Sequence, residues 1–402
     1  MLALAGPAKD DTARRIEPIF KRGKMIGKFS ALVMLLLSAH ALGQESRPRA
    51  RDLGIAPGIY RPGPMNAITD ITGVKVGHVT LIEGTDVRTG VTVILPHDQN
   101  VFQNKVPAAV YLANAFGKLT GSTQIEELGN LETPIVLTNT LSVGTAMEGI
   151  LDHILGLPGN EGVRSVNAVV GETNDGGLNN IRARVVTRQH VLQAIAAASY
   201  GAVREGAVGA GTGTQCLGYK GGIGTSSREV PVGQENYRVG VLVQTNYGGH
   251  LAIDGIPVAK EWRETLESRP LGSPEEGSCM IIVATDAPMA SRNLGRLAKR
   301  AILGIAQTGS FISNGSGDFV IAFSVHTTMR IPHSGSQRLV GAPELPNDSV
   351  SPLFQATKEA TEEAVYNALL QAVSMEGYRG NKAEALPLER LKALLRKYGR
   401  SG

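Results

Sequence analysis

The feature that most constrains the fold is a series of short apolar runs rich in Val, Ile and Ala. Apolar and polar residues do not alternate strictly along them, as they would in a strand with one face in water. Such runs are typical of strands that are covered on both faces, as in layered α/β proteins. We therefore predict strands over Val91–Leu95, Ala108–Leu112, Ile135–Thr138, Val166–Gly171, Tyr237–Thr245, Ser278–Thr285 and Phe319–Val325.

Helical patterns lie between several of these runs. Apolar residues recur every three or four positions along them, and Ser, Pro or Gly mark their ends. Residues 44–66, rich in Arg, Pro and Gly, are predicted to be an extended segment, and residues 268–277 an exposed loop, while 209–227 is a glycine-rich stretch. We predict helices over Ser142–Leu155 with Ser142 as the cap, over Arg188–Val203, after Asp286 and Pro288, from Ser351 to about Gly377 with Val365, Leu369 and Val373 buried, and over Pro387–Tyr398.

Residues 1–43 have the pattern of a secretory signal peptide. Lys24 and Lys28 precede the apolar run 31–37, and small residues follow it. The run is far shorter than the roughly 20 residues that a membrane-spanning helix needs. We expect residues 1–43 to be removed, with Met25 as an alternative start. The mature protein is then expected to be periplasmic or secreted, without a membrane span.

The distribution of charge argues against a nucleic-acid partner. The chain has 40 basic and 36 acidic residues, and residues 1–43 hold seven of the former and three of the latter. From residue 44 onward the two kinds are therefore equal in number. A nucleic-acid-binding protein carries a basic excess that this part of the chain lacks.

The sequence contains no motif for a metal or a cofactor. The eight His include no spacing typical of a metal site, such as H-E-x-x-H. The glycines of 209–213 follow a predicted helix, whereas a dinucleotide-binding loop follows a strand and opens a helix. Cys216 and Cys279 are too few for a disulfide framework, and we expect both to be free and buried.

The most informative chemical feature is the Gly277-Ser278 junction, where a predicted loop meets a predicted buried strand. If this bond breaks, Ser278 becomes an N-terminus that carries both a hydroxyl and an α-amine. A free α-amine has a pKa of roughly 7.7–8.0, so it can act as general base for its own hydroxyl. Gly277 suits the cleavage because it tolerates a strained backbone. On spacing alone, an ordinary loop-to-strand junction stays open, since Gly-Ser dipeptides are common.

Two further segments carry polar side chains at the ends of predicted strands. Asn246 follows the run that ends at Thr245, where its amide can donate to a developing oxyanion. Ser316 and Asp318 precede the next strand and, being two residues apart, are expected to share one face. Each pattern in isolation also fits a turn, so the residues alone leave both interpretations open.

Taken together, these segments resemble the autoproteolytic aminopeptidases that include L-aminopeptidase D-Ala-esterase/amidase and the β-peptidyl aminopeptidases, peptidase family S58. The resemblance runs from about Gly58 to about Thr328, most of the mature chain. Several motifs that occur in the same order identify a family more specifically than any one of them does. They are Ile68–His78, Leu137–Thr140, Gly171–Asn179, Gly211–Gly213, Lys220–Ser227 and Gly277-Ser278.

The resemblance implies an α/β fold, one large domain built as an αββα four-layer sandwich like those of N-terminal-nucleophile hydrolases. It implies self-cleavage into an α chain of residues 44–277 and a β chain of residues 278–402, and a homotetramer of such αβ pairs. The site residues that it implies are Ser278 as nucleophile with its α-amine as base, Asn246 as oxyanion donor, and Ser316 and Asp318 as supports of the nucleophile.

Three positions depart from the family pattern. Relatives carry Glu where Asp318 stands, so the shorter side chain reaches less far. Some carry an acid where Asn139 stands and Tyr where Leu141 stands. Asn139 and Leu141 are therefore the predicted substrate-binding positions at which this chain differs, and the amine-binding pocket and substrate preference differ with them.

The sequence thus predicts an exported serine aminopeptidase that cleaves itself at Gly277-Ser278. Through an acyl-enzyme on Ser278 it would remove small N-terminal residues from peptides, amides or esters, without a cofactor. Two alternatives stay open. An autoproteolytic acyltransferase would pass the acyl group to an amine, although such enzymes tend to use Thr at the junction. A non-catalytic protein that retained the fold would keep an unbroken chain.

Overall fold

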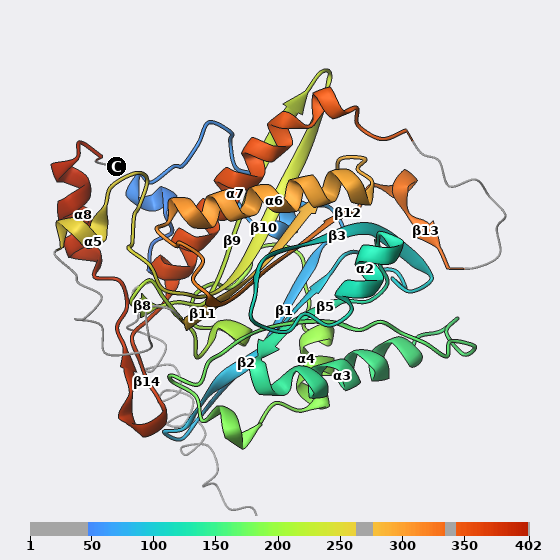
Figure 1. Ribbon diagram of the computed structural model, residues 1–402, viewed down its shortest axis with the longest axis horizontal. Helices are drawn as coiled ribbons and strands as arrows, with labels where there is room; N and C mark the ends of the chain where they lie inside the picture. The colour runs from blue at the N-terminus through green and yellow to red at the C-terminus, as the bar shows by residue number, and fades with distance from the viewer. Residues whose placement is uncertain (1–46, 263–275, 334–342, 401–402) are drawn as a thin grey trace, which may run out of the picture. The chain divides into compact units, whose positions relative to one another are not determined.

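Two β-sheets stacked face to face form the centre of the fold (Figure 1). The structure is a computed structural model that describes residues 47–262, 276–333 and 343–400. The predicted signal peptide, residues 1–43, and most of the loop predicted over 268–277 lie outside these ranges. The described residues belong to one unit, which begins at Arg47.

Within the described residues, the larger sheet has seven strands, six of them in the order β13-β3-β12-β11-β10-β9, with β4 paired to β3. Strand β11 is parallel to β12 and antiparallel to β10, so it is flanked on both sides. The bounds are β3 Asn104–Ala115, β4 Asn130–Leu131, β9 Ile223–Val232, β10 Glu235–Asn246, β11 Glu276–Thr285, β12 Gly315–Ser324 and β13 Ile331–Pro332.

The smaller sheet has four strands in the order β1-β2-β5-β6 within the described ranges. Its bounds are β1 Lys75–Glu83, β2 Val87–Leu95, β5 Ile135–Asn139 and β6 Val169–Thr173. Two short hairpins pair β7 with β8 and β14 with β15. Their bounds are β7 Gln215–Cys216, β8 Tyr219–Lys220, β14 Met375–Glu376 and β15 Lys382–Ala383.

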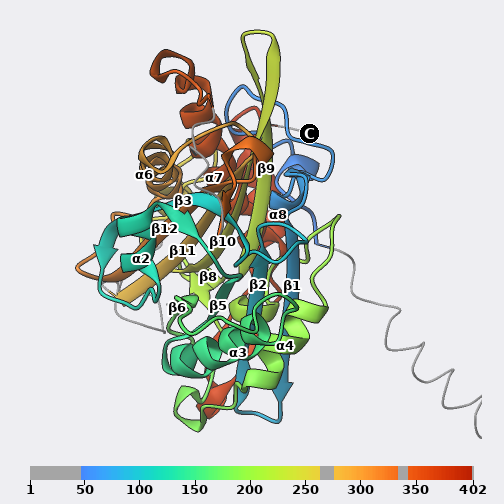
Figure 2. The same ribbon diagram turned by 90° about the vertical axis from the view of Figure 1, so that its right-hand side faces the viewer.

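Helices cover the outer face of each sheet, which makes four layers (Figures 1 and 2). Helices α6 and α7 pack on the larger sheet, and α3 and α4 pack on the smaller one. The order helix, sheet, sheet, helix confirms the predicted αββα sandwich and its α/β class. The helix bounds are α2 Ser122–Leu128, α3 Val143–Leu155, α4 Arg188–Ala196, α5 Val258–Glu261, α6 Ser291–Gln307, α7 Ser351–Gln371 and α8 Leu388–Lys397.

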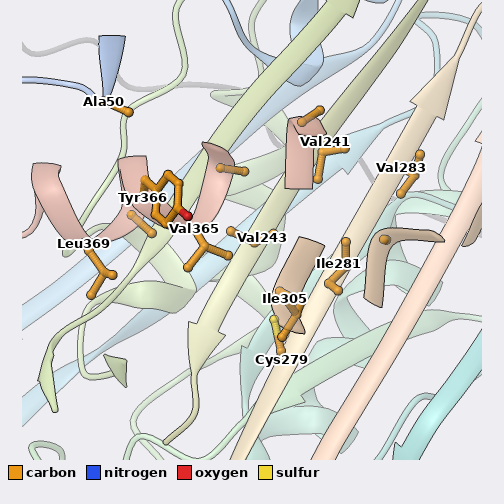
Figure 3. Close-up of a cluster of buried hydrophobic side chains, with 14 of the residues drawn as sticks. Ala50, Val241, Val243, Cys279, Ile281, Val283, Ile305, Val365, Tyr366 and Leu369 are labelled. Carbon is orange, nitrogen blue, oxygen red and sulfur yellow. The ribbon is translucent and has the colours of Figure 1, made fainter. Parts of the chain in front are cut away.

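Apolar side chains fill the spaces between the layers, and β11 contributes to two of these spaces. Cys279 and Ile281 pack against α6 and α7, where Cys279 lies beside Ile305 (Figure 3). Met280 and Ile282 point the other way, into the core between the two sheets. Because both faces of β11 are covered, its sequence shows no polar alternation. Burial of each such side chain contributes about 1.5–3 kcal/mol to folding.

The predicted strands are confirmed in type, and β6 begins three residues later than predicted, at Val169. Strands β1 and β9 and helix α2 were not predicted, because Gly, Thr, Ser and charged residues interrupt their apolar pattern. In β9 these polar groups are satisfied by tertiary contacts that no local pattern reveals. The buried Arg228, for example, donates to Glu363 of α7 at 2.8 Å.

Several predicted helix boundaries are wrong, in each case because the adjoining chain makes other contacts. Helix α4 ends at Ala196, not Val203, since Ser199 leaves it to donate its N–H to the Val76 carbonyl at 3.1 Å. Helix α7 ends at Gln371, because the chain then forms the β14–β15 hairpin, and Val373 lies beyond the helix.

The starts of two other helices also differ from the prediction. Helix α6 begins at Ser291, three residues after Pro288. Ser142 precedes α3 as predicted, but its side chain makes no capping hydrogen bond. A 3-10 turn over Thr140–Ser142 comes first, and the Asn139 side chain caps that turn instead.

Candidate active site

Ser278 lies in the central strand of the larger sheet, β11. It stands directly opposite Asn246 of β10 and beside Gly317 of β12. Its residue surface is 5% exposed, and its Oγ has no hydrogen-bond partner among the described residues. Leaving a buried hydroxyl without a partner costs about 1–3 kcal/mol, so such a group calls for an explanation.

The Ser278 side chain faces the smaller sheet. Side chains alternate along β11, and Cys279 faces helix α6 (Figure 3). Met280, which shares the face of Ser278, lies against Gly171 of β6 so closely that a Cβ on Gly171 would come within 2.4 Å of the Met280 Cε. Ser278 is therefore at the end of the inter-sheet core, on the side of β6.

Asn246 shares that face, because residues directly opposite in an antiparallel pair point to the same side of the sheet. Its Oδ1 accepts the backbone N–H of Gln215 at 3.1 Å, and its Nδ2 donates to the Asn174 carbonyl at 3.0 Å. An amide nitrogen carries two hydrogens, so one remains for a further acceptor. The geometry thus brings a donor beside the Ser278 hydroxyl, as an oxyanion site needs.

Ser316 and Asp318 share one face of β12, as their spacing predicts, but it is the face of Cys279 and not that of the Ser278 side chain. They flank Gly317, the residue beside Ser278. A backbone nitrogen lies in the plane of the sheet and can be approached from either face. These two side chains can therefore approach the backbone of Ser278, whereas its hydroxyl points to the other face.

The Asp318 carboxyl is buried, and burial raises its pKa to about 6, although a hydrogen bond from Ser316 acts in the opposite direction. Its Oδ2 has no hydrogen-bond partner among the described residues. A positive charge close to a buried carboxyl group of this kind strongly stabilises its ionised form.

Gly277 is already inside β11, so the junction with Ser278 lies two residues into the strand and not at its first residue. Gly277 is absent from the described glycines with positive φ, so no left-handed backbone conformation requires a glycine there. Its smallness serves a close approach instead. A Cβ at Gly277 would lie 3.0 Å from the Tyr247 Cα.

A buried acid that the sequence analysis did not single out also borders the site. Glu172 of β6 is 4% exposed, and its carboxylate accepts the Thr140 hydroxyl and, at 3.0 Å, the N–H of Lys118. A Cβ on Gly117 would lie 3.2 Å from the Glu172 Oε1 and 3.4 Å from the Gly317 Cα, which places this carboxylate near the strand beside Ser278. The feature of the sequence that could have indicated this residue is an acidic side chain inside an otherwise apolar strand.

Glu172 has an ion-pair partner that is open to water. The Lys118 Nζ lies 3.5 Å from Glu172 Oε1, and the Lys118 side chain is 55% exposed. Because much of the Lys118 side chain is already in water, its ammonium group can leave this contact without being buried elsewhere. The carboxylate is therefore available to another ammonium group.

The two predicted substrate-binding residues differ in their contacts, because one is hydrogen-bonded within the protein and the other is exposed to solvent. The Asn139 amide donates to the Thr89 hydroxyl at 2.8 Å, and its Oδ1 accepts the Leu141 N–H at 3.1 Å. Both of its polar groups are thus engaged within the protein. Leu141 is 43% exposed and is next to Thr140, the partner of Glu172.

No group of three or more His, Cys, Asp or Glu among the described residues is arranged to hold a metal ion. Cys216 and Cys279 are buried and form no disulfide, as predicted. In the part of the chain that the structure describes, no helix combines the length and the apolar character needed to cross a membrane.

A comparison with known families decides the classification. The model of peptidase family S58 matches residues 66–383. The chain belongs to this family. Its membership confirms the resemblance predicted from the motifs, and it makes the protein a peptidase.

Relatives agree in sequence and in fold. The β-peptidyl aminopeptidase BapA of Sphingosinicella microcystinivorans is 40% identical over 93% of this chain and 98% of the relative. A crystal structure of a protein from Pyrococcus horikoshii OT3 is 47% identical, with a TM-score of 0.82 over 88% of this chain and 100% of that one. The L-aminopeptidase D-Ala-esterase/amidase of Ochrobactrum anthropi, a variant of the Ntn hydrolase fold, is 37% identical, with a TM-score of 0.82 over 89% and 100% of the two chains. The similarity supports an aminopeptidase function.

Proposed function

We propose that this chain is an exported serine aminopeptidase that cuts its own Gly277–Ser278 bond and then removes small N-terminal residues from peptides, amides or esters. The observation that carries the proposal is the buried Ser278 hydroxyl, unpartnered among the described residues and directly opposite Asn246. Export rests on the pattern of residues 1–43, and assembly as a homotetramer of αβ pairs rests on the family resemblance.

Self-cleavage needs only the hydroxyl and the peptide bond beside it. The Ser278 Oγ attacks the Gly277 carbonyl carbon and the C–N bond breaks, so that an ester forms while the hydroxyl proton goes to the departing nitrogen. Water then hydrolyses the ester, which leaves a carboxylate on Gly277 and a free α-amine on Ser278. The packing of Gly277 against Tyr247 fixes the bond in place for this attack.

The mature site then works on a substrate by the same steps. The Ser278 α-amine takes the hydroxyl proton, and Oγ attacks the substrate carbonyl carbon. The remaining Nδ2 hydrogen of Asn246 stabilises the oxyanion, and the ammonium returns its proton to the leaving amine. Water activated by the same amine hydrolyses the acyl-enzyme, which restores Ser278.

Ser316 and Asp318 support the α-amine in this proposal, and not the hydroxyl. They flank Gly317, the residue beside Ser278, and the Asp318 Oδ2 has no partner among the described residues. Cleavage converts a neutral amide into an amine that becomes charged during turnover, so the buried carboxyl gains an opposite charge. The two residues thus favour the protonated amine that donates to the leaving group.

Glu172 is the residue that we propose to bind the substrate ammonium group. It is a buried carboxylate near the strand beside Ser278, and its present ammonium partner, Lys118, is exposed. A substrate with a free amino terminus would replace Lys118 in a charge-assisted contact, which contributes about 1.5–3 kcal/mol. The assignment gives the amine-binding role to Glu172 and not to Asn139, because the Asn139 amide carries no charge to pair with an ammonium group.

Hydrolysis of matched substrate pairs tests the function. The p-nitroanilides of Ala, D-Ala and β-homo-Gly should be cleaved, and their N-acetyl forms should not, because the acetyl group removes the charge that Glu172 binds. Equal cleavage of free and acetylated forms would contradict an aminopeptidase. Addition of an amine acceptor separates the alternatives, since an acyltransferase would form the new amide whereas the proposed hydrolase releases the free amino acid.

A further inference from the structure

Asn246 can act on an oxyanion only if its carboxamide is held with the nitrogen toward Ser278. The two ends of an amide have the same shape, so hydrogen bonds decide which end points where. The bond from the Gln215 N–H to Oδ1, at 3.1 Å, sets this choice, because an N–H cannot serve as partner to Nδ2. The position of Gln215 therefore controls the orientation of the proposed donor.

Gln215 lies in a tight loop, residues 211–222, which runs from the glycine-rich turn after Val208 through the β7–β8 hairpin. The loop wraps around the end of β10. The Leu217 N–H donates to the Tyr247 carbonyl at 2.7 Å, and the Thr245 N–H donates to the Gly222 carbonyl at 2.9 Å. These bonds dock the loop on the residues that flank Asn246.

The centre of the loop is the ammonium group of Lys220, which is fully buried. Its Nζ donates to three backbone carbonyls, those of Gly211 at 3.0 Å, Thr214 at 2.8 Å and Gly221 at 2.8 Å. These carbonyls come from the beginning and the end of the loop. Only a protonated lysine offers three donors to one point, so the ammonium joins both ends of the loop.

Burial destabilises the charged form of Lys220 relative to its neutral form. Desolvation lowers the pKa of Lys220 to about 7 and raises that of Asp175 to about 7, while the Coulombic interaction with Asp175 opposes the shift of Lys220. Asp175 follows Asn174, whose carbonyl accepts the Asn246 Nδ2 at 3.0 Å. The segment that holds the Nδ2 end of the Asn246 amide thus also contains a group that favours the charged form of Lys220.

We propose that Lys220 is a positioning residue for Asn246, whose ammonium group fixes the loop that orients the Asn246 carboxamide through the Gln215 N–H. The inference rests on the proposed function, since it gives Lys220 a task only if Asn246 assists the reaction. Lys220 does not contact the reacting atoms. Its loss should lower turnover by disordering the donor, and should leave binding of the substrate ammonium at Glu172 nearly unchanged.

A double-mutant cycle tests this inference, with kcat expressed per mature Ser278 N-terminus as counted by mass spectrometry. Asn246→Ala should lower kcat by about 10²–10³-fold. Lys220→Met should lower kcat by about tenfold or more, but by less than Asn246→Ala, with KM within about threefold of the wild type. In the Asn246→Ala background, Lys220→Met should change kcat by no more than about twofold, because the donor that it orients is already absent.

The cycle separates the inference from the proposed function. If Asn246→Ala alone leaves turnover unchanged, both the role of Asn246 and the inference are wrong. If Asn246→Ala is slow and Lys220→Met multiplies that loss by its full single-variant factor, only the inference is overturned. Lys105→Met is the matched control, a buried lysine at the far end of β3 from Ser278, and its kcat per mature site should stay at the wild-type value.

A milder variant keeps the test available if Lys220→Met does not fold or mature. Thr245→Val has the same shape and removes the hydroxyl that joins the end of the loop to β10 through the Gly222 N–H at 3.1 Å. We expect a several-fold fall in kcat that disappears in the Asn246→Ala background. A fall of the same factor in both backgrounds would overturn the inference.

Discussion

Replacement of Glu172 by Gln tests the substrate-binding part of the proposal. Gln has the same shape and can still accept the Lys118 N–H and pair with the Thr140 hydroxyl, so the local structure should be kept. Only the negative charge is lost. A charge-assisted contact contributes about 1.5–3 kcal/mol, and 1.4 kcal/mol corresponds to a factor of ten, so kcat/KM for a free-amine substrate should fall about 10- to 150-fold.

The assay measures kcat and KM for Ala p-nitroanilide with mature protein. Most of the loss in Glu172→Gln should appear in KM, because the ammonium contact exists both before and during the reaction. Lys118→Met is the matched control, because its effect on KM should be absent or opposite in sign to that of Glu172→Gln. It removes the ammonium that now lies 3.5 Å from the carboxylate, so KM should stay the same or fall. A Glu172→Gln variant with unchanged KM, or a Lys118→Met variant with a tenfold higher KM, would show that Glu172 does not bind the substrate ammonium group.

Two further predictions concern the residues around Ser278. In mature protein, Asn246→Ala should lower kcat by about 10²–10³-fold, and an unchanged kcat would remove Asn246 from the mechanism. In the uncleaved Ser278→Ala background, Asp318→Asn should raise the melting temperature at pH 7 more than at pH 4. The reason is that the pKa of Asp318 is raised to about 6, so the unfolded chain releases this proton at lower pH than the folded one, and the folded state loses stability as the pH rises through this window. A thermal shift of equal size at both pH values would contradict the raised pKa of the buried Asp318 carboxyl.

Much of the fold could be predicted because its strongest signal is local. The run Met280–Thr285 is apolar at nearly every position, and a strand buried on both faces produces that pattern. Strand β9 lacked the signal, since its Thr225, Ser226 and Ser227 are buried yet polar. Their partners come from distant parts of the chain. Ser227, for instance, donates to Asp70 at 2.6 Å, and no window of sequence contains both.

The candidate site was predictable only where a motif or a strand end marks it. Asn246 and Ser278 each stand at a strand end, but their direct pairing depends on the register of β10 with β11. The register of β11 with β12 puts Asp318 on the face opposite to the Ser278 side chain, which spacing along one strand cannot reveal. Glu172 was missed as a site residue because its relation to Ser278 arises from the stacking of two sheets.

The most direct test of the central claim is intact-mass spectrometry of the purified wild-type protein and of Ser278→Ala. We expect two wild-type chains, of about residues 44–277 and 278–402, with Ser278 as the first residue of the smaller, and one inactive chain for Ser278→Ala. A wild-type protein that is active as a single chain would contradict the account. So would a Ser278→Ala protein that still splits at this bond, because an external protease would then make the cut.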